Sequence, residues 1–356
     1  MPALPPFFAI LFSLFPLFVW WVKQYNHLMI IAGISFFSIT AGMLFPSFPW
    51  LAFILGGGFL FLPNKKTAHP HLSMKFKNRW IKFPAEAIGI WILYTFFRVL
   101  PLKTASELGE KIGKFAGEKI KKRTKLALKN LKYTLPNETK NHKKIIETMW
   151  GNFGRTAGEL PHLKELVKKT KYENISVLKK LKGKPYLIAV FHLNSLGLIS
   201  HCFKKANQEA CLIIRQANNP LTEIFLQKAF GSDLSNLNFL PKGRDGIIQA
   251  VQMLKKNIPV AIATDLHFKD GEDLLFLGKP AKTSNVIVKL AEKFNCPIVC
   301  IKVTRENELD HKVVIDEPIY PDGNTNKIMQ KINDILGNWI KKYPSQWFWI
   351  NNRWNL

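Results

Sequence analysis

Residues 185–197 read Pro-Tyr-Leu-Ile-Ala-Val-Phe-His-Leu-Asn-Ser-Leu-Gly, and this stretch decides the expected fold. Tyr186–Phe191 is a short, continuous apolar run between a Lys-Gly-Lys-Pro turn and a polar break, which is the pattern of a buried strand in a parallel sheet. His192 follows at once, so its side chain is expected at the carboxyl end of that strand. In open α/β sheets this edge is where ligands bind and chemistry takes place.

A second apolar run, Pro259–Thr264, ends in the same way on Asp265. A His and an Asp that leave the same edge of one sheet can act as a general base and the carboxylate that orients it. We therefore predict that His192 and Asp265 form the catalytic pair. The alternative interpretation is that Asp265 only caps a helix or stabilises a turn.

Strand-like and helix-like segments alternate along the rest of the chain. Further strands are expected at Cys211–Ile214, Ile298–Lys302 and Val313–Ile315, and helices at Leu221–Phe230, Gly246–Lys256, Asn285–Phe294 and Lys327–Lys342. This alternation predicts an α/β fold with a mainly parallel or mixed sheet flanked by helices, preceded by N-terminal transmembrane helices.

The chain is strongly basic. Its 356 residues carry 51 Lys and Arg against 25 Asp and Glu, a formal net charge of +26, which indicates an anionic partner. Before Lys65 the only charged side chain is Lys23, and the first acidic residue is Glu86. A basic body behind an apolar leader favours an anionic membrane, and because no nucleic-acid-binding motif is present we expect no nucleic acid as a partner. The four cysteines lack metal-ligand spacing, and neither a metal nor a cofactor is expected.

The leader contains three apolar runs, Phe7–Val22, Leu28–Phe45 and the shorter Trp50–Leu62. Runs of this kind, the first of them ending on two Trp residues, are typical of membrane spans with an interfacial aromatic belt. Residues 1–66 are therefore expected to form an anchor of two or three transmembrane helices. The basic residues that follow, from Lys65 onward, predict that the body lies on the cytoplasmic side.

Residues 67–182 are expected to form a membrane-associated helical region ahead of an α/β core at residues 183–356. Phe83–Leu102 is apolar but too short and too polar for a membrane span, and it fits an interfacial helix. Thr104–Asn130 is strongly helical and rich in Lys and Arg. This basic helix is expected to meet an anionic lipid surface, with a solvated face as the alternative.

Four polar residues are predicted to bind substrate at the same edge of the sheet: Arg215, Asn219, Lys242 and Arg244. The first two follow the strand at 211–214, and the other two lie in the sequence Pro-Lys-Gly-Arg-Asp-Gly. Arg and Lys side chains suit phosphate or carboxylate oxygens because they form charge-assisted hydrogen bonds. The Pro-Lys-Gly-Arg-Asp-Gly sequence could equally be an ordinary exposed turn before a helix that Asp245 caps.

Nine pieces of sequence in a fixed order carry a family resemblance. They are Leu100-Pro101, Leu128-Lys-Asn-Leu131 before Leu135-Pro136, Gly154-Arg155 with Glu159, the His192 strand, Arg215-Gln-Ala-Asn-Asn-Pro220, Pro241-Lys-Gly-Arg-Asp-Gly246, Thr264-Asp265, Phe276-Leu-Gly-Lys-Pro-Ala-Lys-Thr283 and Pro344-Ser-Gln-Trp-Phe-Trp-Ile-Asn-Asn-Arg-Trp354. From about Pro84 to its C-terminus the chain resembles the bacterial lipid A biosynthesis acyltransferases, the lauroyl- and myristoyltransferases that act on glycolipid acceptors.

The resemblance implies a membrane-associated acyltransferase at the bacterial inner (cytoplasmic) membrane. It implies that a His acts as general base and removes the proton from a hydroxyl of the acceptor, which is a glycolipid such as a lipid A precursor or a phospholipid. The hydroxyl then attacks an acyl thioester carried by acyl carrier protein or coenzyme A. No cofactor is implied.

Two positions depart from the family pattern. The family motif is His, four residues, then an acidic residue, but Gly197 stands at that fifth position, and Asn351 stands where the family usually has His. Two hypotheses follow. In the first, which we favour, Asp265 orients His192 and the enzyme works with a different acid. In the second, the site is degenerate and the protein is a membrane-anchored lipid-binding or scaffold protein on the same fold.

Overall fold

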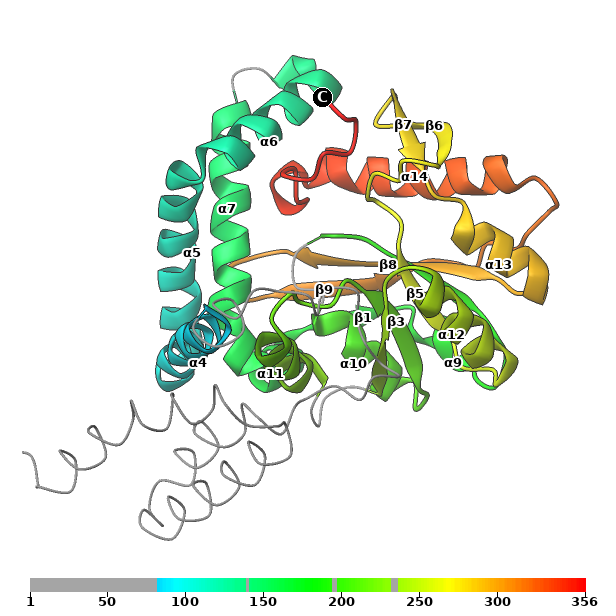
Figure 1. Ribbon diagram of the computed structural model, residues 1–356, viewed down its shortest axis with the longest axis horizontal. Helices are drawn as coiled ribbons and strands as arrows, with labels where there is room; N and C mark the ends of the chain where they lie inside the picture. Colours follow the sequence, from blue (N-terminus) through cyan, green and yellow to red (C-terminus); the bar gives the residue numbers. More distant parts are fainter. Residues whose placement is uncertain (1–81, 139–140, 194–196, 232–235) are drawn as a thin grey trace, which may run out of the picture. The chain divides into compact units, whose positions relative to one another are not determined.

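The structure of the chain is a computed structural model (Figure 1). It describes residues 82–138, 141–193, 197–231 and 236–356. The expected transmembrane anchor at residues 1–66 lies outside these residues. Residues 85–356 form one compact unit by themselves.

Seven strands of the described chain form one sheet in the order β1-β9-β8-β2-β5-β3-β4. Their bounds are β1 (Lys171–Glu173), β2 (Leu187–Val190), β3 (Ala210–Ile214), β4 (Leu237–Pro241), β5 (Val260–Ala263), β8 (Ile298–Arg305) and β9 (His311–Ile315). Strands β8, β2, β5, β3 and β4 run parallel to one another, whereas β9 is antiparallel to β8. The predicted α/β class, with a mainly parallel, mixed sheet flanked by helices, is confirmed.

The helices of the described chain are α4 (Phe83–Val99), α5 (Leu102–Lys119), α6 (Lys121–Thr134), α7 (His142–Glu159), α8 (Leu163–Lys169), α9 (Ile175–Lys180), α10 (Gly197–Lys205), α11 (Pro220–Gly231), α12 (Arg244–Lys255), α13 (Val286–Phe294) and α14 (Thr325–Lys342). Some of them cover both faces of the sheet. One hydrophobic core joins the sheet to α12, α13 and α14, and the other joins it to α8, α9 and α10.

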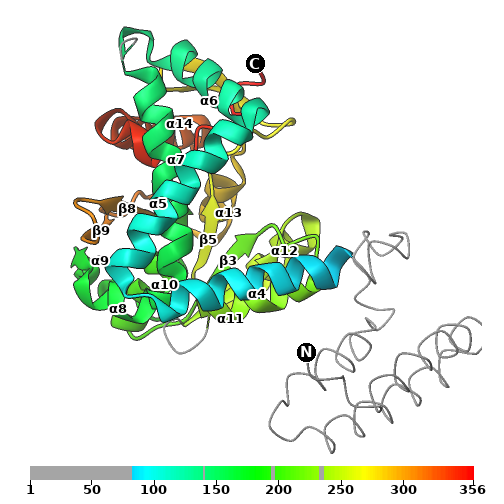
Figure 2. The same cartoon turned by 90° about the vertical axis from the view of Figure 1, so that its left-hand side faces the viewer.

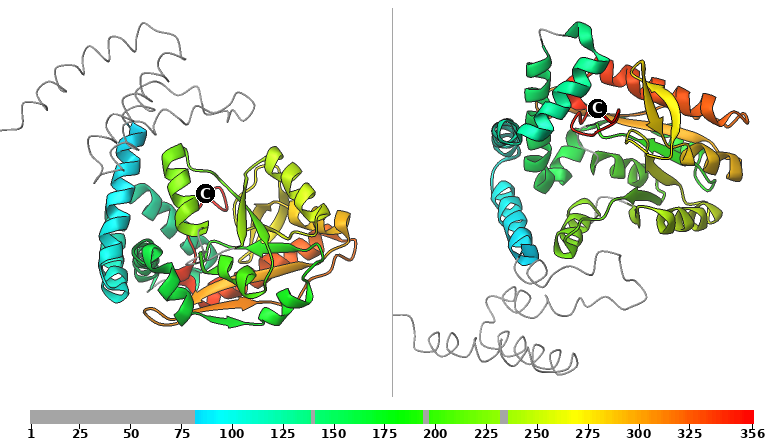
Figure 3. Two further views of the ribbon diagram at one scale, coloured as in Figure 1. Left: turned by 90° about the horizontal axis from the view of Figure 1, so that it is seen from below. Right: turned by 45° about the horizontal axis from the view of Figure 1, so that its top comes forward.

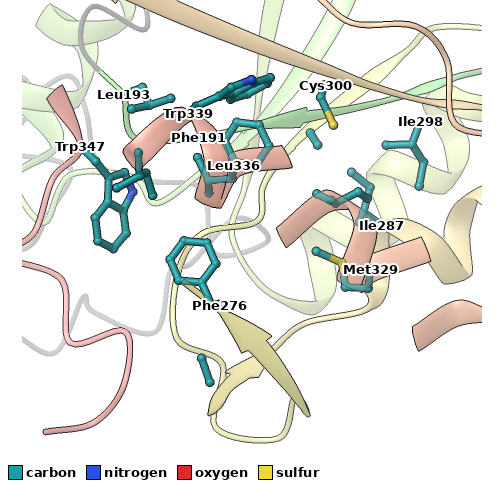
Figure 4. Close-up of a cluster of buried hydrophobic side chains, with 14 of the residues drawn as sticks. Phe191, Leu193, Phe276, Ile287, Ile298, Cys300, Met329, Leu336, Trp339 and Trp347 are labelled. Atoms are coloured by element: carbon teal, nitrogen blue, oxygen red, sulfur yellow. The ribbon is translucent and has the colours of Figure 1, made fainter. Parts of the chain in front are cut away.

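Successive side chains of β2 enter these two different cores. Leu187 and Ala189 belong to the core of α12–α14, and the two residues that alternate with them belong to the core of α8–α10. Side chains of a strand point alternately to opposite faces, and because both faces are covered every residue of β2 is buried. Phe191, just beyond the strand, packs edge-to-face on Trp339 of α14, with ring centroids 5.3 Å apart (Figure 4). His192 therefore leaves a strand that is packed on both sides.

The five strands predicted from apolar runs are all present, but β1, β4 and a separate hairpin were not predicted. The hairpin consists of β6 (Glu272–Phe276) and β7 (Lys279–Thr283). β1 and β4 lie at the two edges of the sheet. Neither contains a continuous apolar run, because β1 has the sequence Lys-Tyr-Glu and β4 has the sequence Leu-Asn-Phe-Leu-Pro. β4 ends in Pro241, a residue that an edge strand tolerates.

β1 lies before residue 183, where the α/β core was expected to begin, yet it pairs with β9 at the edge of the sheet. One strand of the sheet therefore comes from the region that was predicted to be helical. The expected division of the chain at residues 66 and 182 stays a prediction.

The predicted helical stretch Thr104–Asn130 is two helices, because α5 ends and α6 begins on either side of Ile120. α5 lies beside α7 (Figures 1 and 2), and glycines bring the two backbones together. A Cβ added at Gly109 or Gly113 would collide with the backbone of α7 around Gly154. Glycine is needed there because only a residue without a side chain permits this approach.

α4 lies beside α11 (Figures 2 and 3), with the rings of Tyr94 and Phe225 packed edge-to-face at 5.0 Å. On its outer side α4 exposes a row of large apolar residues: Ile88, Trp91, Ile92, Phe96 and Val99. Among the described residues no helix is both long enough and apolar enough to cross a membrane. The predicted transmembrane helices fall on residues that the structure does not describe.

Candidate active site

The ends of β2 and β5 meet at one edge of the sheet because the two strands are parallel neighbours. Val190 of β2 pairs with Ala263 of β5, and the backbone N–H of Thr264 donates to the carbonyl of Val190 at 3.2 Å. His192 and Asp265 each follow two residues after this pair, so they leave the sheet at the same level.

The structure brings the His192 and Asp265 side chains into direct contact. Nδ1 of His192 lies 2.8 Å from Oδ1 of Asp265, and the backbone N–H of His192 donates to Oδ2 at 2.9 Å. Asp265 is 0% exposed, whereas the side chain of His192 remains 32% exposed. Because Nδ1 faces the carboxylate, Nε2 is the ring nitrogen able to exchange a proton with a bound molecule.

The electrostatics of the pair follow from this geometry. The Asp265 carboxylate raises the pKa of His192 above its ordinary value, against the opposing effect of burial. Burial by itself would raise the pKa of Asp265, but the charge and hydrogen bonds of His192, together with the Trp347 N–H, hold that pKa below its ordinary value. Asp265 is thus a carboxylate beside a ring that readily accepts a proton.

Trp347 is a contact of this pair that sequence reasoning missed. Its indole Nε1–H donates to Oδ2 of Asp265 at 2.9 Å. The only signal was the density of Trp residues in the closing segment, which could also be explained by packing. Indeed Trp347, Trp349 and Trp354 pack together with Phe276 in the core of α12–α14. Figure 4 shows Trp347 and Phe276 in this core.

The predicted cations Arg215, Lys242 and Arg244 lie along the same edge of the sheet. Arg215 follows β3 and Lys242 follows β4, the two parallel strands beyond β5, and all three side chains are exposed. Neighbouring strands are spaced by about 4.8 Å, so the ends of β3 and β4 lie roughly 10 and 15 Å along the edge from the end of β2. Long Arg and Lys side chains can act over such distances on a ligand held at His192.

The Pro-Lys-Gly-Arg-Asp-Gly sequence is the turn from β4 into α12. The helix begins at Arg244 after Gly243, with no side-chain cap, so the interpretation of Asp245 as the cap is wrong. A Cβ at Gly246 would collide with the carbonyl oxygen of Pro241, which makes this glycine a requirement of close packing. The same turn leaves Lys242 and Arg244 facing solvent.

Asn219 differs from the three cations because it is buried. Its amide Nδ2 donates to Glu86 at 3.3 Å, and its Oδ1 accepts from the backbone N–H of Leu221 at 3.1 Å. It therefore joins α4 to the start of α11. Its predicted role in substrate binding stays a prediction.

Gly197 is the first residue of α10 and is buried. It offers no carboxylate, and the ring of His192 instead faces Asp265, two residues beyond the neighbouring strand β5. A histidine with one nitrogen held by a buried carboxylate and the other available is the arrangement of a general base. The catalytic roles of the two residues stay predictions.

Comparison with protein families finds a match to the model described as bacterial lipid A biosynthesis acyltransferase, over residues 73–355. A comparison with curated proteins finds no match. The matched range includes both members of the pair, the three cations and the closing Trp-rich segment.

Proposed function

Because the chain belongs to the bacterial lipid A biosynthesis acyltransferase family, we propose that it moves a fatty acyl chain from an acyl thioester to a hydroxyl of a glycolipid such as a lipid A precursor. The donor would be acyl carrier protein or acyl-coenzyme A. The observation that supports this proposal is the 2.8 Å contact of His192 Nδ1 with the buried carboxylate of Asp265.

The proposed reaction begins with the neutral ring of His192, whose Nδ1–H donates to Asp265. Nε2 removes the proton of the acceptor hydroxyl while that oxygen attacks the thioester carbonyl. The tetrahedral intermediate collapses, the C–S bond breaks, and the imidazolium returns the proton to the thiolate that leaves. Asp265 stabilises the imidazolium that exists between these two proton transfers.

Arg215, Lys242 and Arg244 are proposed to hold anionic groups of the substrates. Glycolipid acceptors of this class carry phosphates, and a thioester donor carries a phosphopantetheine arm. Exposed guanidinium and ammonium groups suit such oxygens. Removal of these charges is expected to raise KM for the acceptor or the donor more than it lowers kcat.

The membrane contact is proposed to use the exposed apolar face of α4, at the bacterial inner membrane with the catalytic unit on the cytoplasmic side. Trp91 is 54% exposed and Val99 is 75% exposed, which is unusual for large apolar residues unless they meet lipid or a partner. The predicted basic stretch Thr104–Asn130 covers α5 and α6, which follow α4 in the chain. Contact of this stretch with anionic lipid remains a separate prediction.

A vesicle-binding assay tests the membrane contact. In protein without residues 1–66, whose expected anchor would bind vesicles by itself, Trp91→Glu should weaken sedimentation with anionic vesicles, while Leu275→Glu, an equally exposed apolar position on β6, should not. Equal binding of the two variants would contradict a role for α4.

The second candidate, a lipid-binding or scaffold protein without turnover, is favoured by the two departures from the family pattern, Gly197 and Asn351. The two candidates are separated by incubating the full-length protein with acyl-carrier-protein and coenzyme A thioesters and a lipid A precursor, and by mass spectrometry of the lipids. We expect an acylated product that is lost in His192→Ala and retained in His267→Ala, an exposed histidine close in sequence to Asp265. Absence of product with every donor, together with tight lipid binding, would favour the scaffold. Mass spectrometry of lipids from cells with and without the gene would identify the natural acceptor.

A further inference from the structure

The Asp265 carboxylate is held by three donors that divide unequally between its two oxygens. Oδ2 accepts from the backbone N–H of His192 and from the indole N–H of Trp347, each at 2.9 Å. Oδ1 faces the ring nitrogen Nδ1 of His192 at 2.8 Å. Trp347 lies 82 residues beyond Asp265 and is 0% exposed.

We propose that Trp347 is a positioning residue for the general base, because its indole N–H holds Oδ2 of Asp265 so that Oδ1 stays aligned with the His192 ring. The inference rests on the proposed function, since it gives Trp347 a part in the proton transfer that His192 carries out. The role is separate from packing. The same ring also packs on Trp349 and Phe276, with centroids 4.8 and 5.6 Å away, and another aromatic ring could supply those contacts.

The backbone around Trp347 is tied to the surroundings of the base. Leu193, the residue after His192, forms an antiparallel bridge with Trp347. One residue earlier, the side-chain amide of Gln346 donates to the carbonyl of Arg305 at 2.8 Å and accepts from its N–H at 2.9 Å. The indole is therefore anchored to β8 on one side and to the residue beside the base on the other.

A neutral donor suits this position better than a cation. His192 is in contact with Asp265, and the negative charge of Asp265 also acts on Arg353. Arg353 is buried, and its guanidinium donates to Oγ1 of Thr283 at 2.6 Å and to the carbonyl of Lys282. A guanidinium placed directly on Asp265 would take both oxygens in a bidentate pair. The indole takes one lone pair and leaves the negative charge of the carboxylate to stabilise the imidazolium.

The test removes the N–H and keeps the ring. Trp347 is replaced by 3-benzothienylalanine, in which sulfur stands in place of the indole N–H. We expect kcat to fall about tenfold with KM unchanged, because a hydrogen bond to a charged group is lost while substrate contacts remain. Without the indole N–H, the negative charge of Asp265 acts more strongly on the His192 ring, so the pKa of His192 should rise. The rising limb of the pH–kcat profile should therefore move to higher pH.

Trp349 provides the matched control. It lies in the same aromatic cluster and is fully buried, but its N–H donates to the carbonyl of Pro344 at 2.6 Å. The same replacement there should leave both kcat and the pH profile unchanged. Trp347→Phe, which can be made without an unnatural residue, should reproduce the kinetic effect provided that its circular dichroism spectrum matches that of the wild type.

A readout without turnover separates this inference from the proposed function. NMR titration of ¹⁵N-histidine-labelled, substrate-free protein, with the His192 signal assigned through His192→Gln, measures the pKa of the base directly. A higher pKa in the Trp347 variant than in the Trp349 variant supports the positioning role, even if the wild type transfers no acyl group. An unchanged or lower pKa, or kinetics equal to those of the Trp349 control, would overturn it.

Discussion

Asp265 and Glu159 are both buried carboxylates, and they differ in the side chain with which each one pairs. Asp265 pairs with the partly exposed ring of His192 at the edge of the sheet. Glu159, at the end of α7 and 1% exposed, forms a bidentate pair with Arg305 of β8, with N–O distances of 2.7 and 2.8 Å, and also accepts from Oγ of Ser106 at 2.6 Å. One carboxylate faces a group that can lose its proton, and the other faces a group that cannot.

A histidine stands near each carboxylate, and the two histidines respond in opposite directions. Asp265 raises the pKa of His192. Nε2 of His311 lies 3.9 Å from Glu159, yet its pKa is lowered to about 4, because burial and the charge of Arg305 outweigh the carboxylate. A carboxylate therefore makes a histidine more basic only where the histidine is its main partner. The first arrangement suits proton transfer, and the second braces α5 and α7 against β8.

The largest expected effect is the loss of activity on substitution of Asp265, which should distinguish it from Glu159. Asp265→Asn keeps the shape of the side chain but cannot stabilise the imidazolium, so kcat should fall by roughly 10⁴-fold. The midpoint of thermal unfolding should change little. Steady-state kinetics and circular dichroism measure both quantities, with Asp270→Asn, an exposed acid five residues away, as the control. Full activity of Asp265→Asn would remove the distinction between the two sites.

Glu159→Gln should show the converse behaviour. Loss of the charge leaves the buried guanidinium of Arg305 without its counter-ion, which costs about 3–5 kcal/mol of unfolding free energy. Activity per folded molecule should be unchanged. Urea denaturation measures the loss, and Glu165→Gln, which breaks an exposed pair with Lys169, should cost less than about 1 kcal/mol. A fall in kcat without a loss of stability would mean that Glu159 serves the chemistry instead.

The contrast between the two histidines should be visible in the pH dependence of stability. The folded pKa of His311 lies below its unfolded value, so between about pH 6.5 and pH 4 the unfolded chain binds a proton that the native protein does not. Its contribution to stability is therefore lost as the pH falls through this range, by on the order of 3 kcal/mol. His192 has a raised pKa and contributes in the opposite sense, with stability present at low pH and lost as the pH rises through its folded pKa.

Urea midpoints measured across this pH range for the wild type and His311→Gln test the assignment. The variant should lose stability less steeply on acidification. If the two curves run parallel, His311 does not exchange a proton on unfolding as its surroundings indicate.

The smallest effect is expected at Gly197. Restoring the family's acidic residue with Gly197→Glu should change kcat less than about twofold, because Nδ1 of His192 already has its carboxylate. The same substitution in the Asp265→Asn background sharpens the test. A large gain from Gly197→Glu in the wild type, with Asp265→Asn fully tolerated, would show a weakened or retired enzyme.

The sequence was sufficient to predict the five inner strands of the sheet and the pair at the ends of two of them. Continuous apolar runs mark β2 and β5, and since parallel strands end at the same edge, the residues that follow them had to lie close together. The edge strands β1 and β4 escaped prediction because they bury too little to show an apolar run.

The long-range polar contacts could not be predicted. Trp347 reaches Asp265 across 82 residues and Arg305 reaches Glu159 across 146, and no local pattern connects either pair. A Trp in an apolar segment and an Arg at the end of a strand each have ordinary explanations in packing and solvation. Only the folded chain shows which donor meets which carboxylate.

The backbone hydrogen bond just beyond β2 makes the hydrogen-exchange rate of one amide a measure of how often the His192–Asp265 contact opens. The amide of His192 lies beyond the strand, which ends at Val190, and its proton is bound to the side chain of Asp265 rather than to a neighbouring strand. Its exchange with deuterium therefore requires that the carboxylate swing away, not that the sheet open. The uptake of a single deuteron at His192 would report how often the unliganded site comes apart.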